Sequence, residues 1–594
     1  MIEKLFELRS NTIYQFANSQ LFPKKPTIEF MPKEQSCPAC GKALKVKYTQ
    51  RRQLVTMHIG HFDAHCTFLY CDCGDVVYPP QKINSLVPKH CNFGYDVIEY
   101  IGRELFSRHC TIDVIKQGLA EKNIFISKSE IAYLAAKYVV YLSLAHKEIT
   151  GNIKTEMQEN GGYILHIDGT CDGGSPHLMS ALDQISGFVL HNIKIPTENA
   201  QDIIPLLQEV KQRYGNPIAI VTDMAKAFSC AITEVFEGIP HFICHFHFLR
   251  DIGKDLLSKP YDSIRKKLKT YKISRQLRYR LQKFNETDIL VNASEMESSF
   301  IELITENPDE NTIHKLCFIL IHWCLDAKHS GNGYGFPFDR PHQVFYQRLM
   351  HTHKKLSQIK QMLENKDIQN KLVEKLLSDL NQLTADNQLK TSNKEIIEKA
   401  EIFDKLRRAL HIAPTDKNNG LNDNGDDEDI KSIKNKVNMF CEEISTQKYS
   451  QNTDYQKLIK QIEKYKVKLF ADPITVINSN SEEIAIQPQR TNNLLEQFFR
   501  GLKRDYTKRS GNSKLSKALQ SMIADTPLIK NLDNQNYRTI LLNGYNTLEE
   551  RFAEIAEKEV IEKLKEIKSG EQKIPKQLKK AIRKTKVMEK FLNL

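Results

Sequence analysis

Between residues 161 and 250, short apolar segments alternate with amphipathic ones, and this alternation constrains the fold more than any other feature of the sequence. Five segments have the length and composition of buried strands, and they cover residues 163–168, 178–183, 188–193, 218–222 and 241–244. Apolar residues at helical spacing predict helices over residues 199–214 and 225–236. The sequence therefore predicts an α/β core that begins at about residue 155 and runs to about residue 255.

The order of these elements also predicts which strands are neighbours. Three strands at hairpin spacing, followed by helix, strand, helix and strand, is the order of a ribonuclease-H-like sheet. In that order the first and fourth strands lie side by side. Asp168 ends the first predicted strand and Asp223 ends the fourth, so the two carboxylates are expected to meet at one edge of the sheet.

A third acidic residue lies on a predicted amphipathic helix near residue 496. The apolar stripe of this helix, at i, i+3, i+4 and i+7, consists of Leu495, Phe498, Phe499 and Leu502. The neighbouring stripe consists of Asn493, Glu496, Arg500 and Lys503. Glu496 would therefore lie at the edge of the packed face, beside cations that suit a phosphate backbone. Glu482 and Glu483 are the alternatives for the third acid.

Asp168, Asp223 and Glu496 together predict a centre for phosphodiester chemistry. Magnesium and manganese prefer hard oxygen ligands, and three carboxylates can hold two such ions roughly 3.5–4 Å apart, one at the attacking oxygen and one at the leaving oxygen. Any one of these acids taken alone is better explained as a helix cap or a surface ion pair. Two acids at strand ends and one on a basic helix favour the metal centre.

Two cysteine pairs near the N-terminus predict a structural zinc site. Cys37 and Cys40 form a Cys-x-x-Cys pair, Cys71 and Cys73 form a Cys-x-Cys pair, and a glycine follows each pair. Four thiolates can bind zinc tetrahedrally and leave no open position for catalysis. Because the second pair is shorter than usual, a substitute ligand is an alternative, and the candidates are His61, His65 and Cys66. A zinc ribbon is expected over residues 36–90, with reduced buried cysteines as the competing interpretation.

Three short predicted helices over residues 91–150 favour a helix-turn-helix domain. A short helix, a tight connection and a serine-capped third helix fit this motif, and the region of Ser127, Lys128 and Ser129 would then enter the major groove of DNA. Helical trios also occur in many unrelated folds. The position of this one between a predicted zinc ribbon and a phosphoryl-transfer core favours the DNA-binding interpretation.

The rest of the chain is predicted to be mainly helical. Residues 1–35 form an N-terminal helical segment, and residues 256–483 form an all-helical insertion that separates the second carboxylate from the third. Within the insertion, residues 416–427 are polar and predict a flexible loop. Residues 484–525 return to the core with Glu496, and residues 526–594 form a basic helical C-terminal region.

The charge distribution favours a polyanionic partner. The formal net charge is +12, and basic residues crowd two places. The cations that follow the third carboxylate are Arg500, Lys503, Arg504, Lys508 and Arg509. Those of the C-terminal tail are Lys573, Lys576, Lys579, Lys580, Arg583, Lys584, Lys586 and Lys590, and a solvated helix is an equally good explanation of that tail. Neither a signal peptide nor a membrane span is predicted, so we expect a cytoplasmic protein associated with the nucleoid of a prokaryote.

Four short motifs resemble those of DDE transposases of the Mutator-like and related bacterial insertion-sequence groups. They are residues 166–170 (HIDGT), residues 220–224 (IVTDM), the pair Cys244 and His247 in CHFH, and residues 492–500 (NNLLEQFFR). A long helical insertion before the glutamate also fits these groups. The resemblance covers residues 155–255 and 485–525 well and most of the insertion by position alone.

The resemblance implies a function and a set of roles. Asp168, Asp223 and Glu496 would be the metal-binding triad, and the reaction would be nicking at transposon ends followed by attack of a 3′-hydroxyl on target DNA. His247 would lie near the scissile phosphate or pack beside it. Trp323 would stack on a base flipped out beside the cut, although a buried core role is favoured by its apolar neighbours. The protein would act on double-stranded DNA as a homodimer or a higher oligomer.

Two other functions stay open at this point. One is a transposase-derived, sequence-specific DNA-binding regulator with an idle core. The other is a nuclease of the same fold that acts on RNA or branched DNA, because a fold alone does not choose a substrate. The predicted zinc and helix-turn-helix modules favour duplex DNA.

Overall fold

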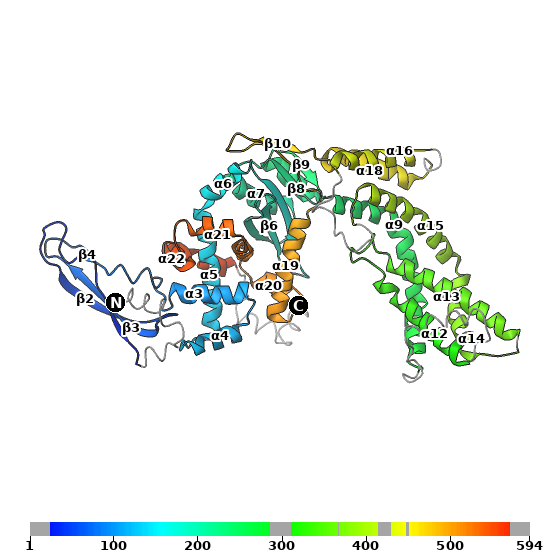
Figure 1. Cartoon of the computed structure of the whole chain (residues 1–594), viewed down its shortest axis with the longest axis horizontal. Helices are drawn as coiled ribbons and strands as arrows, with labels where there is room; N and C mark the ends of the chain where they lie inside the picture. Colours follow the sequence, from blue (N-terminus) through cyan, green and yellow to red (C-terminus); the bar gives the residue numbers. More distant parts are fainter. Residues whose placement is uncertain (1–23, 285–309, 366, 414–428, 447–450, 571–594) are drawn as a thin grey trace, which may run out of the picture.

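The computed structural model describes residues 24–284, 310–365, 367–413, 429–446 and 451–570 (Figure 1). It is a mixed α+β structure with separate hydrophobic clusters in the N-terminal sheet, in a central body and in a helical arm. The central body lies between the other two parts (Figure 1). The predicted loop at 416–427 and the basic tail that begins at Lys573 lie outside the described residues.

A four-stranded sheet makes up the N-terminal part. Its strands are β1 (Thr27–Phe30), β2 (Lys45–Thr56), β3 (Gly60–Tyr70) and β4 (Val77–Tyr78). β3 pairs with all three others. Strand β1 falls in the segment 1–35 for which a helix is expected. That prediction is wrong for its described part, because Ile28 and Phe30 alternate with exposed residues and pack on β3.

Five helical elements follow the N-terminal sheet. They are α3 (Tyr95–Gly102), η1 (Arg103–Ser107), α4 (Ile112–Glu121), α5 (Lys128–Glu148) and α6 (Thr150–Glu159). Ser127 caps α5, and its hydroxyl accepts a hydrogen bond from the Glu130 amide at 3.1 Å. Serine at this position thus starts α5 as the sequence predicts.

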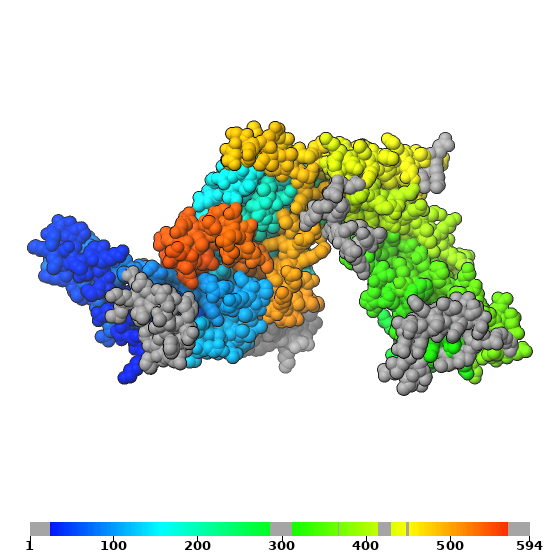
Figure 2. All heavy atoms as spheres, in the orientation of Figure 1, coloured from blue at the N-terminus to red at the C-terminus, as the bar shows by residue number. Residues whose placement is uncertain are grey.

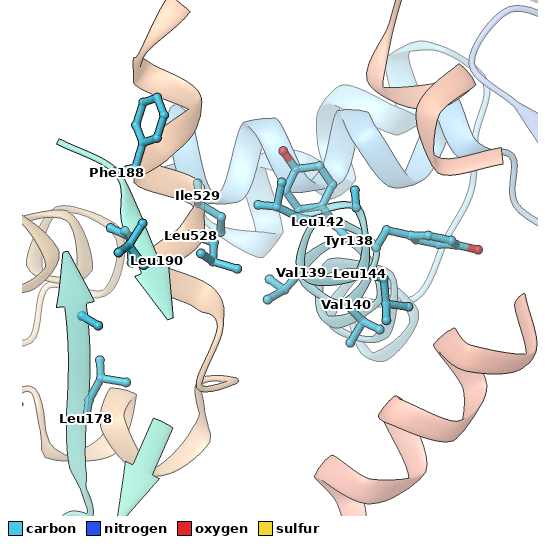
Figure 3. Packing of buried hydrophobic residues seen from close by; sticks show 14 of the residues in the cluster. Tyr138, Val139, Val140, Leu142, Leu144, Leu178, Phe188, Leu190, Leu528 and Ile529 are labelled. Carbon is cyan, nitrogen blue, oxygen red and sulfur yellow. The ribbon is translucent and has the colours of Figure 1, made fainter. Parts of the chain in front are cut away.

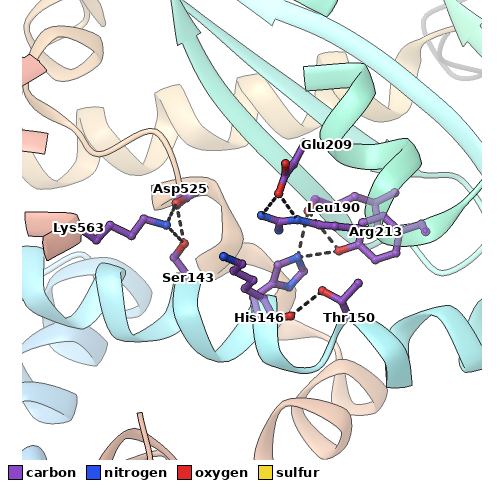
Figure 4. Close-up of polar contacts among 10 residues, drawn as sticks. Ser143, His146, Thr150, Leu190, Glu209, Arg213, Asp525 and Lys563 are labelled. Carbon is purple, nitrogen blue, oxygen red and sulfur yellow. Dashed lines mark hydrogen bonds and ion pairs between the residues drawn. The ribbon is translucent and has the colours of Figure 1, made fainter. Parts of the chain in front are cut away.

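Helix α5 is a core helix rather than a free recognition helix. Tyr138, Val139 and Leu142 are buried with residues of β7 and of a C-terminal helix (Figure 3). Polar contacts add to this packing, since Ser143 and Lys563 both contact the Asp525 carboxylate (Figure 4). The exposed residues of α5 are Lys128, Ser129 and Ala132 near its start and Lys147 and Glu148 at its end. The helix-turn-helix interpretation is therefore restricted to the start of α5.

The central sheet has five strands in the order β7-β6-β5-β8-β9. The strands are β5 (Ile164–Thr170), β6 (His177–Asp183), β7 (Val189–Ile195), β8 (Ala219–Thr222) and β9 (His241–Ile243). β5, β6 and β7 are antiparallel neighbours, whereas β8 is parallel to β5 and β9 is parallel to β8. Helices α7 (Ala200–Tyr214) and α8 (Lys226–Val235) connect the last strands. The prediction that the first and fourth strands are neighbours is confirmed.

The helical arm has its own hydrophobic core. Its elements are α9 (His245–Thr270), α10 (Ile273–Leu281), α12 (Glu310–Leu325), η3 (Asp326–His329), α13 (Pro341–Glu364), α14 (Lys371–Ala385), α15 (Asn387–Ala409), α16 (Ile430–Ile444) and α18 (Thr453–Leu469). The chain leaves and re-enters the central body at adjacent points, because the His245 amide donates to the Arg490 carbonyl at 2.8 Å. The arm thus begins at His245, ten residues before the end that the sequence predicts for the first part of the core.

A β-hairpin spans the end of the predicted all-helical insertion at residue 483. Strands β10 (Ile474–Ile477) and β11 (Glu483–Ile486) pair with each other and with no other strand of the described residues. Ile474 and Ile486 pack against the central sheet beside Ile164 and Val221. The hairpin therefore belongs to the central body, and the prediction of an all-helical insertion is wrong at this end.

The closing segment returns to the central body. Its elements are α19 (Asn493–Ser510), α20 (Ser516–Ser521), η4 (Thr526–Asp533), α21 (Gln535–Leu542), α22 (Leu548–Ala553) and α23 (Glu557–Gly570). Buried Lys137 of α5 lies 2.6 Å from the Glu557 carboxylate of α23, and Tyr537 is fully buried in the same cluster as α5. The described part of residues 526–594 is thus not a separate region. None of the described helices is long and apolar enough to cross a membrane.

Candidate active site

Asp168 and Asp223 lie on neighbouring parallel strands in matching register. His166 pairs with Val221 across β5 and β8, and each aspartate is two residues further along the chain. Asp168 is within β5 rather than at its end, because Gly169 and Thr170 still pair with β6. Asp223 directly follows β8. The register therefore brings both carboxylates to one edge of the sheet, as the sequence predicts.

The protonation of the two aspartates reflects their surroundings. Burial and then the negative charge of Asp223 raise the pKa of Asp168 to about 8, with smaller contributions from Glu496 and Glu198. The Gly169 amide opposes this shift by donating to Oδ1 of Asp168 at 2.8 Å. Burial also raises the pKa of Asp223, whereas the hydrogen bond from the Ala225 amide and the positive charge of Arg250 lower it by a smaller amount. Several carboxylates thus share one poorly solvated place, which a cation would stabilise.

Glu496 lies in the first turn of α19 and is half-buried. Leu495, Phe499 and Leu502 of the same helix are buried in the central cluster, as the apolar stripe predicts. The Glu496 carboxylate lies 3.2 Å from Nη2 of Arg500 and 3.7 Å from Nε2 of His247. Burial raises its pKa, and the charges of Arg500 and Arg250 lower it. Glu496 also contributes to the raised pKa of Asp168, so the two are electrostatic neighbours.

Cys244 and His247 mark the start of α9 beside this site. The Cys244 amide donates to the Thr222 carbonyl at 2.8 Å, one residue before Asp223. Burial, and then the charges of Arg250 and Lys254, lower the pKa of His247 to about 3. His247 is therefore a neutral imidazole, and it contacts Glu496 rather than solvent.

Glu198 is an acid of this site that the sequence reasoning missed. It lies between β7 and α7, and Nδ1 of His177 is 3.6 Å from its carboxylate. Burial and the charge of Asp223 raise its pKa, which shows that it shares the surroundings of the two aspartates. The available signal was its place directly before the Asn199 cap of a helix that follows a strand.

The carboxylates suit a divalent metal by their chemistry. Asp168, Asp223 and Glu496 offer hard oxygen donors, and their negative charges oppose one another. In the described part of the chain, the only group of three or more potential ligands with all donor atoms within 4.8 Å of one another is a set of four cysteines. The acids are thus more widely spaced than the ligands of a single compact site.

The four cysteines of the N-terminal sheet could hold a metal ion. Their sulfur atoms are close together, since Cys37 lies 3.5 Å from Cys73 and Cys40 lies 3.4 Å from Cys71. The amides of Ala39 and Cys40 lower the pKa of Cys37, whereas contacts with the other three thiols raise the pKa of Cys73. The four thiols thus share protons in the metal-free cluster, and a metal ion would favour the thiolate form.

The three alternative zinc ligands suggested by the sequence, His61, His65 and Cys66, lie outside the cluster of four cysteines. Cys66 packs in the core of the N-terminal sheet, and burial raises its thiol pKa. His61 accepts a long hydrogen bond of 3.4 Å from the Phe125 amide. Neither these residues nor His65 belongs to the cysteine cluster.

The predicted DNA-binding residues have different surroundings. The exposed residues of α19 include Arg500, Lys503, Arg504 and Lys508. The orange segment that contains α19 borders a wide gap between the central body and the helical arm (Figure 2). Arg509 turns inward instead, with its guanidinium 5.7 Å from the centre of the Phe106 ring. Asn493 is half-buried, and its amide donates to Thr491. Ser127, Lys128 and Ser129 are exposed at the start of α5, where Lys128 pairs with Asp113 at 2.5 Å.

Trp323 is exposed, and the favoured prediction of a buried role is wrong. Its side chain is 41% exposed on α12, whereas its neighbours Ile321 and Cys324 are each 1% exposed. Those neighbours occupy the packed face of the helix, so Trp323 lies on the other side. The Arg348 guanidinium is 5.1 Å from the centre of its ring.

Comparisons with known proteins yield a distant structural likeness. No family model matches the sequence, and no curated protein matches it. A similar solved structure is the Drosophila P element transposase strand transfer complex, with a TM-score of 0.33 and 10% sequence identity. The match covers 76% of this chain and 94% of the other.

Proposed function

We propose that this protein is a DDE-type transposase that cuts double-stranded DNA at transposon ends and joins the ends to target DNA. The observation that carries the proposal is the placement of three carboxylates. Asp168 and Asp223 occupy matching positions along two parallel strands, and Glu496, which follows the helical arm in the sequence, contributes to the raised pKa of Asp168. The strand order, with three antiparallel strands followed by two parallel ones, supports a ribonuclease-H-like core.

In this proposal Asp168, Asp223 and Glu496 hold two magnesium or manganese ions. Such ions activate an attacking oxygen and stabilise a leaving oxygen in phosphodiester chemistry. Glu198 supplies further negative charge at the same place. His247 of α9 lies beside Glu496, with its Nε2 3.7 Å from the carboxylate. The exposed cations of α19 bind the phosphate backbone next to the reacting phosphate.

The outlying parts serve the binding of DNA. Zinc on Cys37, Cys40, Cys71 and Cys73 stabilises the N-terminal sheet, because four thiolates leave no open position for chemistry. The exposed first turn of α5 and Trp323 are further candidate DNA contacts. Joining two transposon ends requires at least two active sites, so the working form is a homodimer or a higher oligomer.

The proposal is tested by binding and nicking of the same DNA in the same buffer. The substrate is duplex DNA that carries the sequences flanking the gene, with Mg²⁺ or Mn²⁺ present. Asp168→Asn should bind normally and lose nicking by at least about a hundredfold. Glu482→Gln is the matched control, because it removes an exposed acid that also competes for the role of Glu496.

Other results would point to other functions. Binding of the duplex by the wild-type protein without nicking under any metal condition would favour a DNA-binding regulator. Cleavage of RNA or branched DNA, together with no binding of duplex DNA at low salt, would favour a nuclease. Full nicking activity of Asp168→Asn would rule out the proposed centre.

A further inference from the structure

One buried side chain holds the N-terminal end of α19 against the central sheet. Asn492 precedes the first residue of α19 and is 0% exposed. Asparagine at this position usually accepts a hydrogen bond from an amide of its own helix. The side chain of Asn492 makes no such bond, so its amide is available for contacts with other elements.

Those contacts are made with strand β5. Oδ1 of Asn492 lies 2.9 Å from Nδ1 of His166, and Nδ2 donates to the Ile167 carbonyl at 3.2 Å. The backbone amide of Asn492 also contacts the Cys244 sulfur at 3.3 Å, directly before α9. A single residue thus connects the starts of α19 and α9 with the middle of β5.

The ring of His166 contacts Gln184 as well as Asn492. It is fully buried, and its Nε2 lies 3.2 Å from Oε1 of Gln184. The same Oε1 accepts a hydrogen bond from the Gln489 amide at 2.9 Å. The chain that leads into α19 is therefore held to β5 both directly and through Gln184.

We infer that Asn492 is a positioning residue that sets where Glu496 stands relative to Asp168. The inference rests on the proposed function, because it assigns Asn492 to the same metal centre. Glu496 follows Asn492 by one helical turn, and its amide donates to the Asn492 carbonyl at 3.1 Å. Asp168 directly follows Ile167, which accepts the Asn492 side chain. Residues that orient metal ligands in this way affect metal affinity without touching the ion.

The chain offers a closely matched control residue. Asn531 is 3% exposed, its Oδ1 accepts from the Val189 amide at 2.8 Å, and its Nδ2 donates to the Val189 carbonyl at 2.9 Å. Asn531 thus bonds a neighbouring strand as Asn492 does, but away from the three acids. Truncation of either residue removes a buried amide with similar partners, so a general loss of stability should be comparable.

The first test measures hydrogen exchange in the metal-free full-length protein. Asn492→Ala should speed exchange in the first turn of α19 by about tenfold or more, because the contacts that hold this turn are lost. Asn531→Ala should affect η4 and β7 instead. Asn492→Ser provides a second variant, since serine keeps a helix cap but cannot make both contacts with β5.

The second test measures Mn²⁺ binding by electron paramagnetic resonance. Asn492→Ala and Asn492→Ser should bind Mn²⁺ about 10- to 100-fold more weakly than the wild type, and Asn531→Ala should bind as the wild type does. Asn492 variants that match Asn531→Ala in both measurements would overturn the inference. Asp168→Asn serves as the reference variant. If it leaves Mn²⁺ binding unchanged, the metal centre and the proposed function fail, whereas the exchange data still report whether Asn492 holds α19.

Discussion

Removal of the Asp168 carboxylate should stabilise the metal-free protein at alkaline pH. A carboxyl group whose pKa is about 8 in the folded chain and about 3.9 in the unfolded chain binds more protons when folded. Its contribution to stability is therefore fully present below pH 4 and is lost as the pH rises towards 8 and above. Asp168→Asn removes this loss, because the amide stays neutral.

The size of the effect follows from the same shift. Each pKa unit corresponds to about 1.4 kcal/mol, so four units set an upper limit of about 5–6 kcal/mol. Solvent around the half-buried carboxylate and the other acids of the site reduce the expected gain to about 2 kcal/mol at pH 9. With Mg²⁺ present, the wild-type protein should instead be more stable than Asp168→Asn, since the wild type gains stability from binding the ion and the variant does not.

The assay is calorimetric unfolding at pH 5 and pH 9, with and without Mg²⁺. Asp525→Asn is the control, because the buried Asp525 carboxylate accepts hydrogen bonds from Ser143 and Lys563, and the Lys563 charge lowers its pKa against the effect of burial. That substitution removes a satisfied buried acceptor and should destabilise the protein under all four conditions. The reasoning is refuted if Asp168→Asn is destabilising at pH 9 without metal, or if Mg²⁺ stabilises both proteins equally.

Further predictions concern the outlying parts of the molecule. Cys40→Ser should lower the zinc content measured by mass spectrometry. It should also lower the free energy of unfolding of the N-terminal sheet by a few kcal/mol, about the scale of a lost structural ligand. An unchanged zinc content would contradict the cysteine site. Lys503→Ala should weaken DNA binding and reduce the slope of log affinity against log salt by about 1, whereas Lys558→Ala, which removes an exposed cation of α23, should not. Trp323→Ala should cost less than about 1.5 kcal/mol in denaturant unfolding because its ring is 41% exposed, and a cost above about 3 kcal/mol would mean that the ring is packed.

The sequence predicts the central sheet and its two aspartates well. Apolar runs of strand length have few alternatives when they alternate with helices, and the connection lengths leave one sensible order of strands. The register of β5 and β8 is less determined by the sequence, because both faces of β8 are buried and a slip of one residue would move Ile220 from one packed face to the other. The choice of Glu496 rests on helical spacing, on its cationic neighbours and on the motif at residues 492–500, and its role stays a prediction.

Other features depend on contacts that the sequence does not reveal. Helix α5 has the local signals of a recognition helix, but its burial comes from distant residues such as Tyr537 and Phe552. Trp323 has apolar neighbours in sequence, yet they lie on the other side of its helix. Hairpin β10–β11 is short and half-exposed, so its pattern is weak. Glu198 joins the site only through the fold of the sheet.

The adjacent exit and entry points of the helical arm make it a replaceable unit. The His245 amide bonds the Arg490 carbonyl, so the two ends of more than 200 intervening residues meet as closely as the ends of a tight loop. The entropy of closing such a loop depends weakly on its length. Arms of very different size, or a short peptide linker, could therefore join the same two points while the central sheet and α19 keep their relative positions.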